Sequence, residues 1–170
     1  MTEEKTKFII DRENLLVKVE RVFDAPLDLV WSAWTEAELL DQWWGPKPYK
    51  AETKIMDFTV GGKWLYAMVG PEGAVVGWNI KLFSRIVPRK SFAYRSLFCD
   101  ENGDMKPETT GSNWDIFFFE RAGVTVVTSD IRVDSLEHLE AQLKMGFKEG
   151  YTAGLDQLEE LLARLRKKGG

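Results

Sequence analysis

Apolar and polar residues alternate along much of the chain, and a two-residue period is typical of half-buried β-strands. The alternation first appears over residues 7–23, where Leu15, Val17 and Val19 share one side. The polar stretch 11–14 inside this segment suits the turn of a hairpin, or equally a polar strand edge. The segment therefore predicts one strand or two short strands joined by a turn.

The period changes to that of an α-helix after residue 25. Pro26 suits a first helical turn. The apolar residues that follow recur at helical spacing: Leu27, Val30, Trp31 and Trp34. Thr35 and Glu38 match a capping box, which predicts the start of a second short helix, and Gly45-Pro46 ends it.

A run of strands is predicted from residue 50 to residue 132, because the two-residue period returns and is interrupted by glycine and proline turns. The predicted strands cover 50–59, 63–69, 74–87, 91–99, 112–120 and 123–132. Consecutive strands with short connections form an antiparallel meander, and one face of such a sheet must be covered.

The cover is a predicted helix over residues 135–166, in which leucines and aromatic residues recur at intervals of three and four. Asp134 and Glu137 match a second capping box at its start. A helix of about 32 residues is about 48 Å long, enough to cross the whole sheet. We therefore predict an α+β protein of one domain over residues 1–170, with a curved antiparallel sheet of six or seven strands, two short helices after the first strand and a long C-terminal helix.

Three glycines interrupt this helix on one face, at Gly146, Gly150 and Gly154. Each costs about 1 kcal/mol relative to alanine inside a helix. Three explanations remain open: close packing of the helix on the sheet, a ligand groove beneath the helix, or a contact with a partner helix.

Aromatic residues dominate one predicted face of the strands. Trp64, Tyr66 and Met68 share a face, and we place Trp78 and Ile80 of the next strand beside them. The residues predicted to line a cavity are Trp44, Phe58, Trp64, Tyr66, Met68, Trp78, Ile80, Tyr94, Ser96, Phe98, Trp114, Ile116, Phe118, Phe147 and Tyr151. Such a wall either surrounds a ligand or is dry core. Trp43 and Trp44 are adjacent, so one of them is expected at the cavity mouth or on the surface.

Composition and charge narrow the function classes. The 170 residues are 44% apolar and carry a net charge of −4, and their basic residues form no stripe of the kind that nucleic acids require. No apolar run has the length of a membrane span or a signal peptide. The single cysteine, Cys99, suits a reducing compartment, so we expect a cytoplasmic protein.

Sequence motifs for chemistry are scarce. No nucleotide-binding or hydrolase motif occurs. With one histidine and one cysteine in the chain, a zinc or iron site would have to be built from carboxylates, so we expect no cofactor, no metal and no catalytic residue. His138 is interpreted as an exposed residue of a first helical turn. Hydroxyl groups of Tyr66, Tyr94, Ser96 and Tyr151 are better suited to orienting a ligand.

Four segments carry a resemblance to a known family. They are RVFDAPLDLVWSAWTEAELLDQWWGP (21–46), DFTVGGKWLYAMVGPEG (57–73), RIVPRKSFAYRS (85–96) and GFKEGYTAGLDQLEELL (146–162). The chain resembles the heat-shock protein 90 ATPase activator-like (Aha-type) family of the START/SRPBCC superfamily. The resemblance implies a helix-grip fold with a hydrophobic cavity between the sheet and the C-terminal helix.

The resemblance does not imply a single activity, because members of the superfamily bind lipids, sterols or hormones, catalyse cyclisations, or stimulate a chaperone. Our first hypothesis is a protein that binds a small hydrophobic or aromatic molecule. The alternatives are a co-chaperone that acts through its surface, and a cyclase or hydrolase that works in the same cavity. The sheet edges and an exposed tryptophan also leave a homodimer open.

Overall fold

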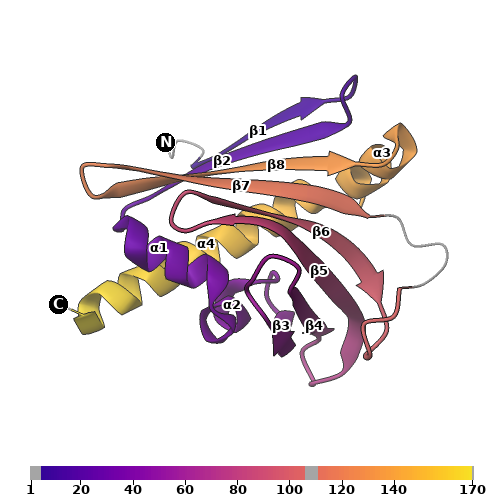
Figure 1. Ribbon diagram of the computed structural model, residues 1–170, viewed down its shortest axis with the longest axis horizontal. Coiled ribbons are helices and arrows are strands. Elements are labelled where there is room, and N and C mark those ends of the chain that lie inside the picture. The colour runs from indigo at the N-terminus through magenta and orange to yellow at the C-terminus, as the bar shows by residue number, and fades with distance from the viewer. Residues whose placement is uncertain (1–4, 106–110, 170) are drawn as a thin grey trace.

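A single curved antiparallel sheet encloses one long helix in the computed structural model, which describes residues 5–105 and 111–169 (Figure 1). Within these residues there are eight strands and four helices. They are β1 (Thr6–Asp11), β2 (Leu16–Phe23), α1 (Leu27–Thr35), α2 (Ala37–Trp43), β3 (Lys50–Met56), β4 (Lys63–Val69), β5 (Val75–Val87), β6 (Ser91–Cys99), β7 (Ser112–Arg121), β8 (Val124–Val133), α3 (Leu136–Lys144) and α4 (Phe147–Gly169).

The strands lie in the order β1-β2-β8-β7-β6-β5-β4-β3. The meander from β3 to β8 is therefore confirmed, and β2 joins it by pairing with β8. The polar stretch 11–14 is the turn of a hairpin: the backbone N–H of Asn14 donates to the Asp11 carboxylate at 3.1 Å. This hairpin supplies the eighth strand, so the prediction of six or seven was too low. The first strand of the meander ends at Met56, three residues earlier than predicted, because the turn before β4 already begins there.

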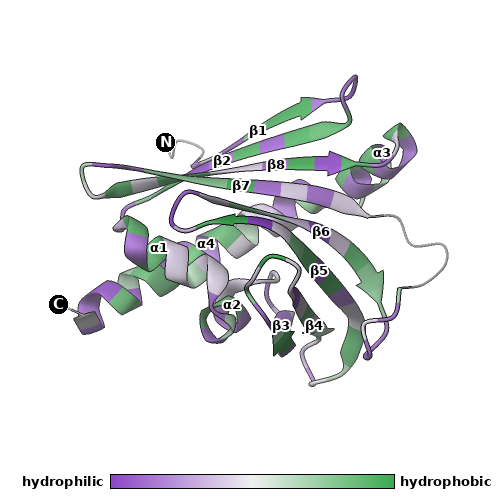
Figure 2. Ribbon diagram, viewed as in Figure 1, coloured by the Kyte–Doolittle hydropathy of each residue, from purple (hydrophilic) through white to green (hydrophobic). Residues whose placement is uncertain are grey.

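Helix α4 crosses the side of the sheet that the curve encloses, while α1 and α2 lie beside it near one end (Figure 1). Helix α2 contacts both β3 and α4. Hydrophobic and hydrophilic positions follow each other along the strands and along α4, as the amphipathic pattern requires (Figure 2). The α+β helix-grip architecture predicted from the sequence is therefore confirmed.

The prediction of one continuous C-terminal helix was wrong. Helix α3 ends at Lys144, and Gly146, with a φ of +94°, turns the chain before α4 begins. That backbone conformation strongly favours glycine. The cap of α3 also differs from the prediction, because the Ser135 hydroxyl accepts the N–H of His138 at 3.1 Å, while Asp134 pairs with Arg95.

The first predicted capping box was also wrong. Thr35 is the last residue of α1, and its hydroxyl donates to the carbonyl of Trp31 at 2.8 Å. The residue before α2 is Glu36, whose side chain makes no capping hydrogen bond. The box fails because α1 continues through the position that would have to cap α2.

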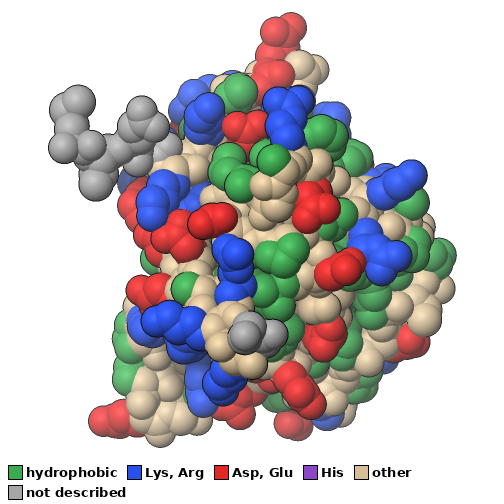
Figure 3. All heavy atoms as spheres, turned by 90° about the vertical axis from the view of Figure 1, so that its left-hand side faces the viewer, with side chains coloured by type: hydrophobic (Ala, Val, Ile, Leu, Met, Phe, Trp, Pro, Cys, Tyr) green, Lys and Arg blue, Asp and Glu red, His purple; other side chains and the backbone are tan. Residues whose placement is uncertain are grey.

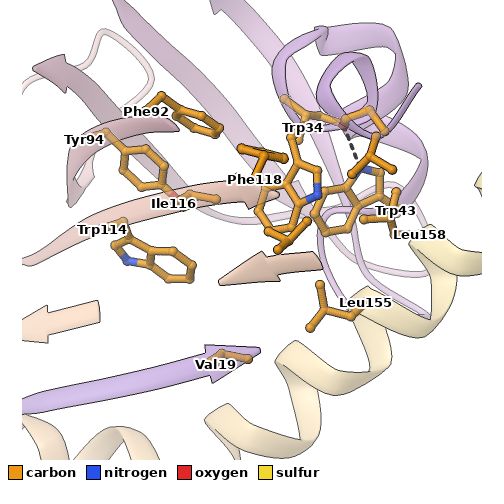
Figure 4. Close-up of a cluster of buried hydrophobic side chains, with 14 of the residues drawn as sticks. Val19, Trp34, Trp43, Phe92, Tyr94, Trp114, Ile116, Phe118, Leu155 and Leu158 are labelled. Atoms are coloured by element: carbon orange, nitrogen blue, oxygen red, sulfur yellow. Dashed lines mark hydrogen bonds between the residues drawn. The ribbon is translucent and has the colours of Figure 1, made fainter. Parts of the chain in front are cut away.

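Tryptophans of α1 and α2 fill the core where the helices meet the sheet. Trp34 and Trp43 lie 4.8 Å apart between ring centroids, and the Trp43 indole N–H donates to the Ala33 carbonyl at 2.9 Å. Figure 4 shows these two rings beside Phe118, with Leu155 of α4 facing them. This end of the enclosed space is densely packed core.

Gly146 has a left-handed backbone conformation, whereas Gly150 lies inside helix α4, so alanine should change the stability of the protein in opposite directions at the two positions. Gly146→Ala should lower the free energy of unfolding by about 1–2 kcal/mol, because an L-residue is strained in the left-handed region. The measurement is urea denaturation followed by circular dichroism.

Gly150→Ala serves as the matched control. Its added methyl group would lie 3.8 Å from the Pro46 ring, an ordinary contact, so helix propensity should raise stability by up to about 1 kcal/mol. Equal effects of the two substitutions would contradict this account of the helix break.

Candidate functional site

A pocket of about 460 Å³ opens between the sheet and the helices, and Trp43 of the tryptophan core forms part of its wall. Strands β4 to β7, helices α3 and α4, and the α2–β3 connection all contribute to its wall. Nine of the fifteen residues predicted as cavity lining border it: Trp44, Tyr66, Met68, Trp78, Ser96, Phe98, Trp114, Phe147 and Tyr151.

Five further predicted residues lie in the main core instead of the pocket wall: Phe58, Trp64, Tyr94, Ile116 and Phe118. For Phe58 and Phe118 the reason is α1, whose Trp31 ring packs edge-on at 5.0 Å from Phe118 and 6.0 Å from Phe58. The aromatic wall is therefore dry core under α1 and pocket lining further along. From sequence alone these were competing interpretations of the same residues.

Ile80 was predicted on the wrong face of the sheet. It pairs with Leu65, and both belong to a second apolar cluster with Cys99 on the other face. Trp78 borders the pocket, but its side chain packs against that same cluster. The apolar residues Trp78, Ile80 and Leu82 pack in this outer cluster, whereas the alternate positions of β5 carry Asn79 and Lys81. The usual assignment of the apolar set to the inner face therefore gave the wrong face here, since an error of one residue exchanges the two faces.

The register instead turns Asn79 and Lys81 toward the helices. Lys81 is only 2% exposed and borders the pocket. Its ammonium group donates three hydrogen bonds, to the Tyr66 hydroxyl at 3.1 Å, the Asn79 side-chain carbonyl at 2.9 Å and the Ser96 hydroxyl at 3.0 Å. Sequence analysis missed this residue, although a lysine within an apolar strand is a recognisable signal.

Aromatic rings surround the same nitrogen atom. Lys81 Nζ lies 5.1 Å from the ring centroids of Tyr66 and Tyr94, 5.2 Å from that of Trp44 and 5.6 Å from that of Trp64. Ring faces at these distances attract a cation. Burial acts in the opposite direction and lowers the pKa of Lys81 to about 7, a shift that the nearby Cys99 thiol partly opposes.

The tyrosines of the site are neutral hydroxyl groups. Burial raises the pKa values of Tyr66, Tyr94 and Tyr151 well above the ordinary 10. The Tyr66 hydroxyl accepts from the Trp44 indole at 2.9 Å as well as from Lys81. The Tyr151 hydroxyl shares a 2.9 Å hydrogen bond with Ser129. These groups orient polar atoms without ionising.

A second polar region comes from α3. His138 borders the pocket and is half-buried, so its interpretation as an exposed residue was wrong. The Nδ1 atom of His138 and the Oε1 atom of Gln142 are buried without a hydrogen-bond partner among the described residues. The helix break at Gly146 places α3 against β8, where these side chains reach the pocket.

The adjacent residues Trp43 and Trp44 differ in burial, as neighbouring positions at the end of a helix require. Trp43 is 1% exposed and packs in the core at the pocket's edge, whereas Trp44 is half-buried and borders the pocket with its ring 5.2 Å from Lys81 Nζ. Two of the three glycines, Gly150 and Gly154, also border the pocket from α4. A Cβ atom at Gly154 would be 3.6 Å from the Trp43 carbonyl oxygen, an ordinary contact, so neither glycine is required by a backbone clash.

Other kinds of site find no support within residues 5–105 and 111–169. No helix there is long and apolar enough to cross a membrane. No group of three acidic, histidine or cysteine side chains there is arranged to hold a metal ion. On the face shown in Figure 3, acidic and basic side chains are interspersed with apolar ones.

Comparison with solved structures shows the same fold in several bacterial proteins. Protein Ms6760 from Mycobacterium smegmatis is 26% identical, with a TM-score of 0.83 over 94% of this chain and 98% of that one. A protein from Arthrobacter aurescens is 27% identical, with a TM-score of 0.86 over 93% and 91%. A protein from Staphylococcus epidermidis is 26% identical, with a TM-score of 0.81 over 91% and 93%.

Comparison with curated protein sequences gave no significant match. The family model described as "Activator of Hsp90 ATPase homolog 1-like protein" matches residues 24–163, which include α1, α2, the whole meander and most of α4. The chain therefore belongs to the activator of Hsp90 ATPase homolog 1-like family, as the motifs in its sequence predicted.

Proposed function

We propose that this protein binds a small hydrophobic or aromatic molecule in the pocket between the sheet and helices α3 and α4. The observation that carries the proposal is the pocket itself: about 460 Å³, walled largely by aromatic rings and with a few polar groups. Small-molecule sites typically measure about 300–1,000 Å³ and have this mixture of apolar wall and sparse polar atoms.

The rings are held in place before any ligand arrives. Trp114 stacks on Tyr94 at 5.7 Å, and Phe147 stacks on Tyr151 at 5.6 Å. The Trp114 indole N–H donates to Ser112 at 3.0 Å, which fixes the plane of the ring. A wall of fixed rings favours flat apolar ligands, because little side-chain freedom is lost on binding.

N-Phenyl-1-naphthylamine, a neutral aromatic dye, tests this function. We expect saturable one-to-one binding with increased fluorescence, and a higher melting temperature of the protein in its presence. Gly150→Leu would place a leucine side chain in the volume that the bound dye occupies. Overpacking of this kind costs about 1–3 kcal/mol, so binding should weaken roughly tenfold or more. Fluorescence titration measures both affinities.

Ala141→Leu provides the control for an added leucine side chain, since Ala141 is exposed on α3 and does not border the pocket. Its affinity for the dye should equal that of the unmodified chain. Binding that is absent, non-saturable or equally weakened by both substitutions would count against the proposed function.

The family description supplies a second candidate, a co-chaperone that stimulates an Hsp90-type ATPase through its surface. A role that depends on the protein's surface would not require Trp44 or the pocket. The two candidates therefore differ in which residues they require.

A steady-state ATPase assay with purified Hsp90 separates them. Under the ligand-binding proposal, saturating amounts of the chain leave the ATPase rate unchanged, because the pocket residues face inward. A rise in rate that Gly150→Leu preserves would instead assign the protein a surface-mediated role.

A further inference from the structure

Lys81 is a buried base without an acidic partner. Its three hydrogen-bond acceptors, Tyr66, Asn79 and Ser96, are all neutral groups. No aspartate or glutamate occurs among the described residues that border the pocket. A buried ammonium group without a counter-charge is unfavourable, and proteins seldom retain one unless something pairs with it.

Three tyrosines face Lys81 or its pocket, and their hydroxyl groups are neutral at neutral pH. Tyr66 faces it from β4, Tyr94 from β6 and Tyr151 from α4, all with raised pKa values. Cys99 lies behind the sheet, and His138 borders the same pocket from α3. The described residues that border the pocket therefore supply acceptors and rings for the cation but no carboxylate.

We infer that the pocket takes its hydrophobic ligand as an organic anion, a carboxylate or sulfonate whose charged group lies beside Lys81 while its apolar part contacts the aromatic wall. This inference rests on the proposed function and names the chemical class of its ligand. The anion supplies the carboxylate or sulfonate charge that the described border of the pocket lacks.

Hydroxyl groups beside Lys81 are arranged to help hold an anion. Tyr66 already accepts two hydrogen bonds, from Trp44 and Lys81, so its own hydrogen is left to be donated. Ser112 accepts from Trp114 in the same way. Strand register sets Lys81 opposite Ser96 and Ser96 opposite Ser112, so a cation and two hydroxyls form one row across β5, β6 and β7.

Two opposing effects set the charge of Lys81: the aromatic rings and burial. The rings attract the ammonium form, whereas burial disfavours it and lowers the pKa of Lys81 to about 7. At neutral pH the group is thus close to the midpoint of its titration. A bound anion stabilises the ammonium form, so binding should draw a proton from solution above pH 7.

Two dyes with the same ring skeleton isolate the charged group. 8-Anilino-1-naphthalenesulfonate carries a sulfonate that N-phenyl-1-naphthylamine lacks. At pH 6 the unmodified chain should bind the sulfonate at least about tenfold more tightly, which is the scale of one charge-assisted interaction. Isothermal titration calorimetry and fluorescence titration give the two dissociation constants.

Lys81→Met removes the charge while keeping an unbranched apolar side chain. The preference for the sulfonate should fall by about tenfold or more, and affinity for the neutral dye should stay within about threefold. Lys90→Met is the matched control, because Lys90 is exposed in the turn between β5 and β6 and its loss changes net charge equally. Retained binding of the neutral dye also shows that the variant is folded.

The pH profile provides a second test that does not depend on the methionine variant. Affinity of the unmodified chain for the sulfonate should be constant below about pH 7 and then fall by up to about tenfold per pH unit. Lys81→Arg keeps a charge that does not titrate in this range, so the preference should remain and the fall should disappear. Calorimetry at pH 8 in phosphate and in Tris, two buffers with different ionisation enthalpies, measures the protons taken up on binding. The unmodified chain should take up nearly one proton, and the Lys81→Arg variant none.

The outcomes separate the two proposals. If both dyes bind alike, or if Lys81→Met keeps the sulfonate preference and the proton uptake, the inference is overturned and the proposed function stands. If neither dye binds, both fail. A preference that depends on Lys81 and disappears as pH rises supports both.

Discussion

Burial of the apolar face of α4 against the enclosed side of the sheet is the interaction on which the rest of the structure depends. Leu155, Leu158, Leu161 and Leu162 are each 2% exposed or less. Fully burying such a side chain contributes about 1.5–3 kcal/mol. Without this helix the inner face of the curved sheet would be open to water, because α1 and α2 cover one end only (Figure 1).

Polar contacts set where the helix lies on the sheet. The Gln157 side-chain amide donates to the carbonyl oxygens of Trp43 and Gly45 at 3.1 and 2.9 Å, and its carbonyl accepts the N–H of Lys47 at 2.9 Å. On the other side, the buried Arg21 of β2 donates to Asp156 at 2.7 Å. These contacts attach α4 to β2 and to the connection between α2 and β3, so the helix holds a defined position above the strands.

The same arrangement divides the enclosed space into two parts. Bulky rings from α1 and α2 fill the part under those helices, whereas α4 presents Gly150 and Gly154 over the other part. The absence of side chains at these two positions leaves volume that a ring could otherwise occupy. The pocket is thus a consequence of where large and small residues fall along two helices, and it surrounds the most unusual polar group of the sheet, Lys81.

Strongly periodic features of the chain were predictable. The meander, the two short helices and the helical C-terminus follow from local alternation and spacing, and the motifs identified the family. Breaks and caps were less predictable, because Gly146 acts through its backbone conformation and Ser135 through one hydroxyl group, and a repeating leucine pattern shows neither. Cavity-lining residues on β4 and α4 were placed on the correct side, since their strand or helix has one clearly apolar face.

The sequence by itself determined the order and type of most elements, because periods of two and of three to four residues are local properties. Only the tertiary structure decided which face of β5 points inward, since that depends on its pairing with β4 and β6, and the inward face is the one that carries Asn79 and Lys81. It also decided which aromatic residues are core and which border a pocket, because that depends on where α1 ends above the sheet. The tertiary structure also shows what surrounds Lys81, namely four aromatic rings within 5.6 Å of its ammonium nitrogen, which the lysine's position in the sequence does not reveal.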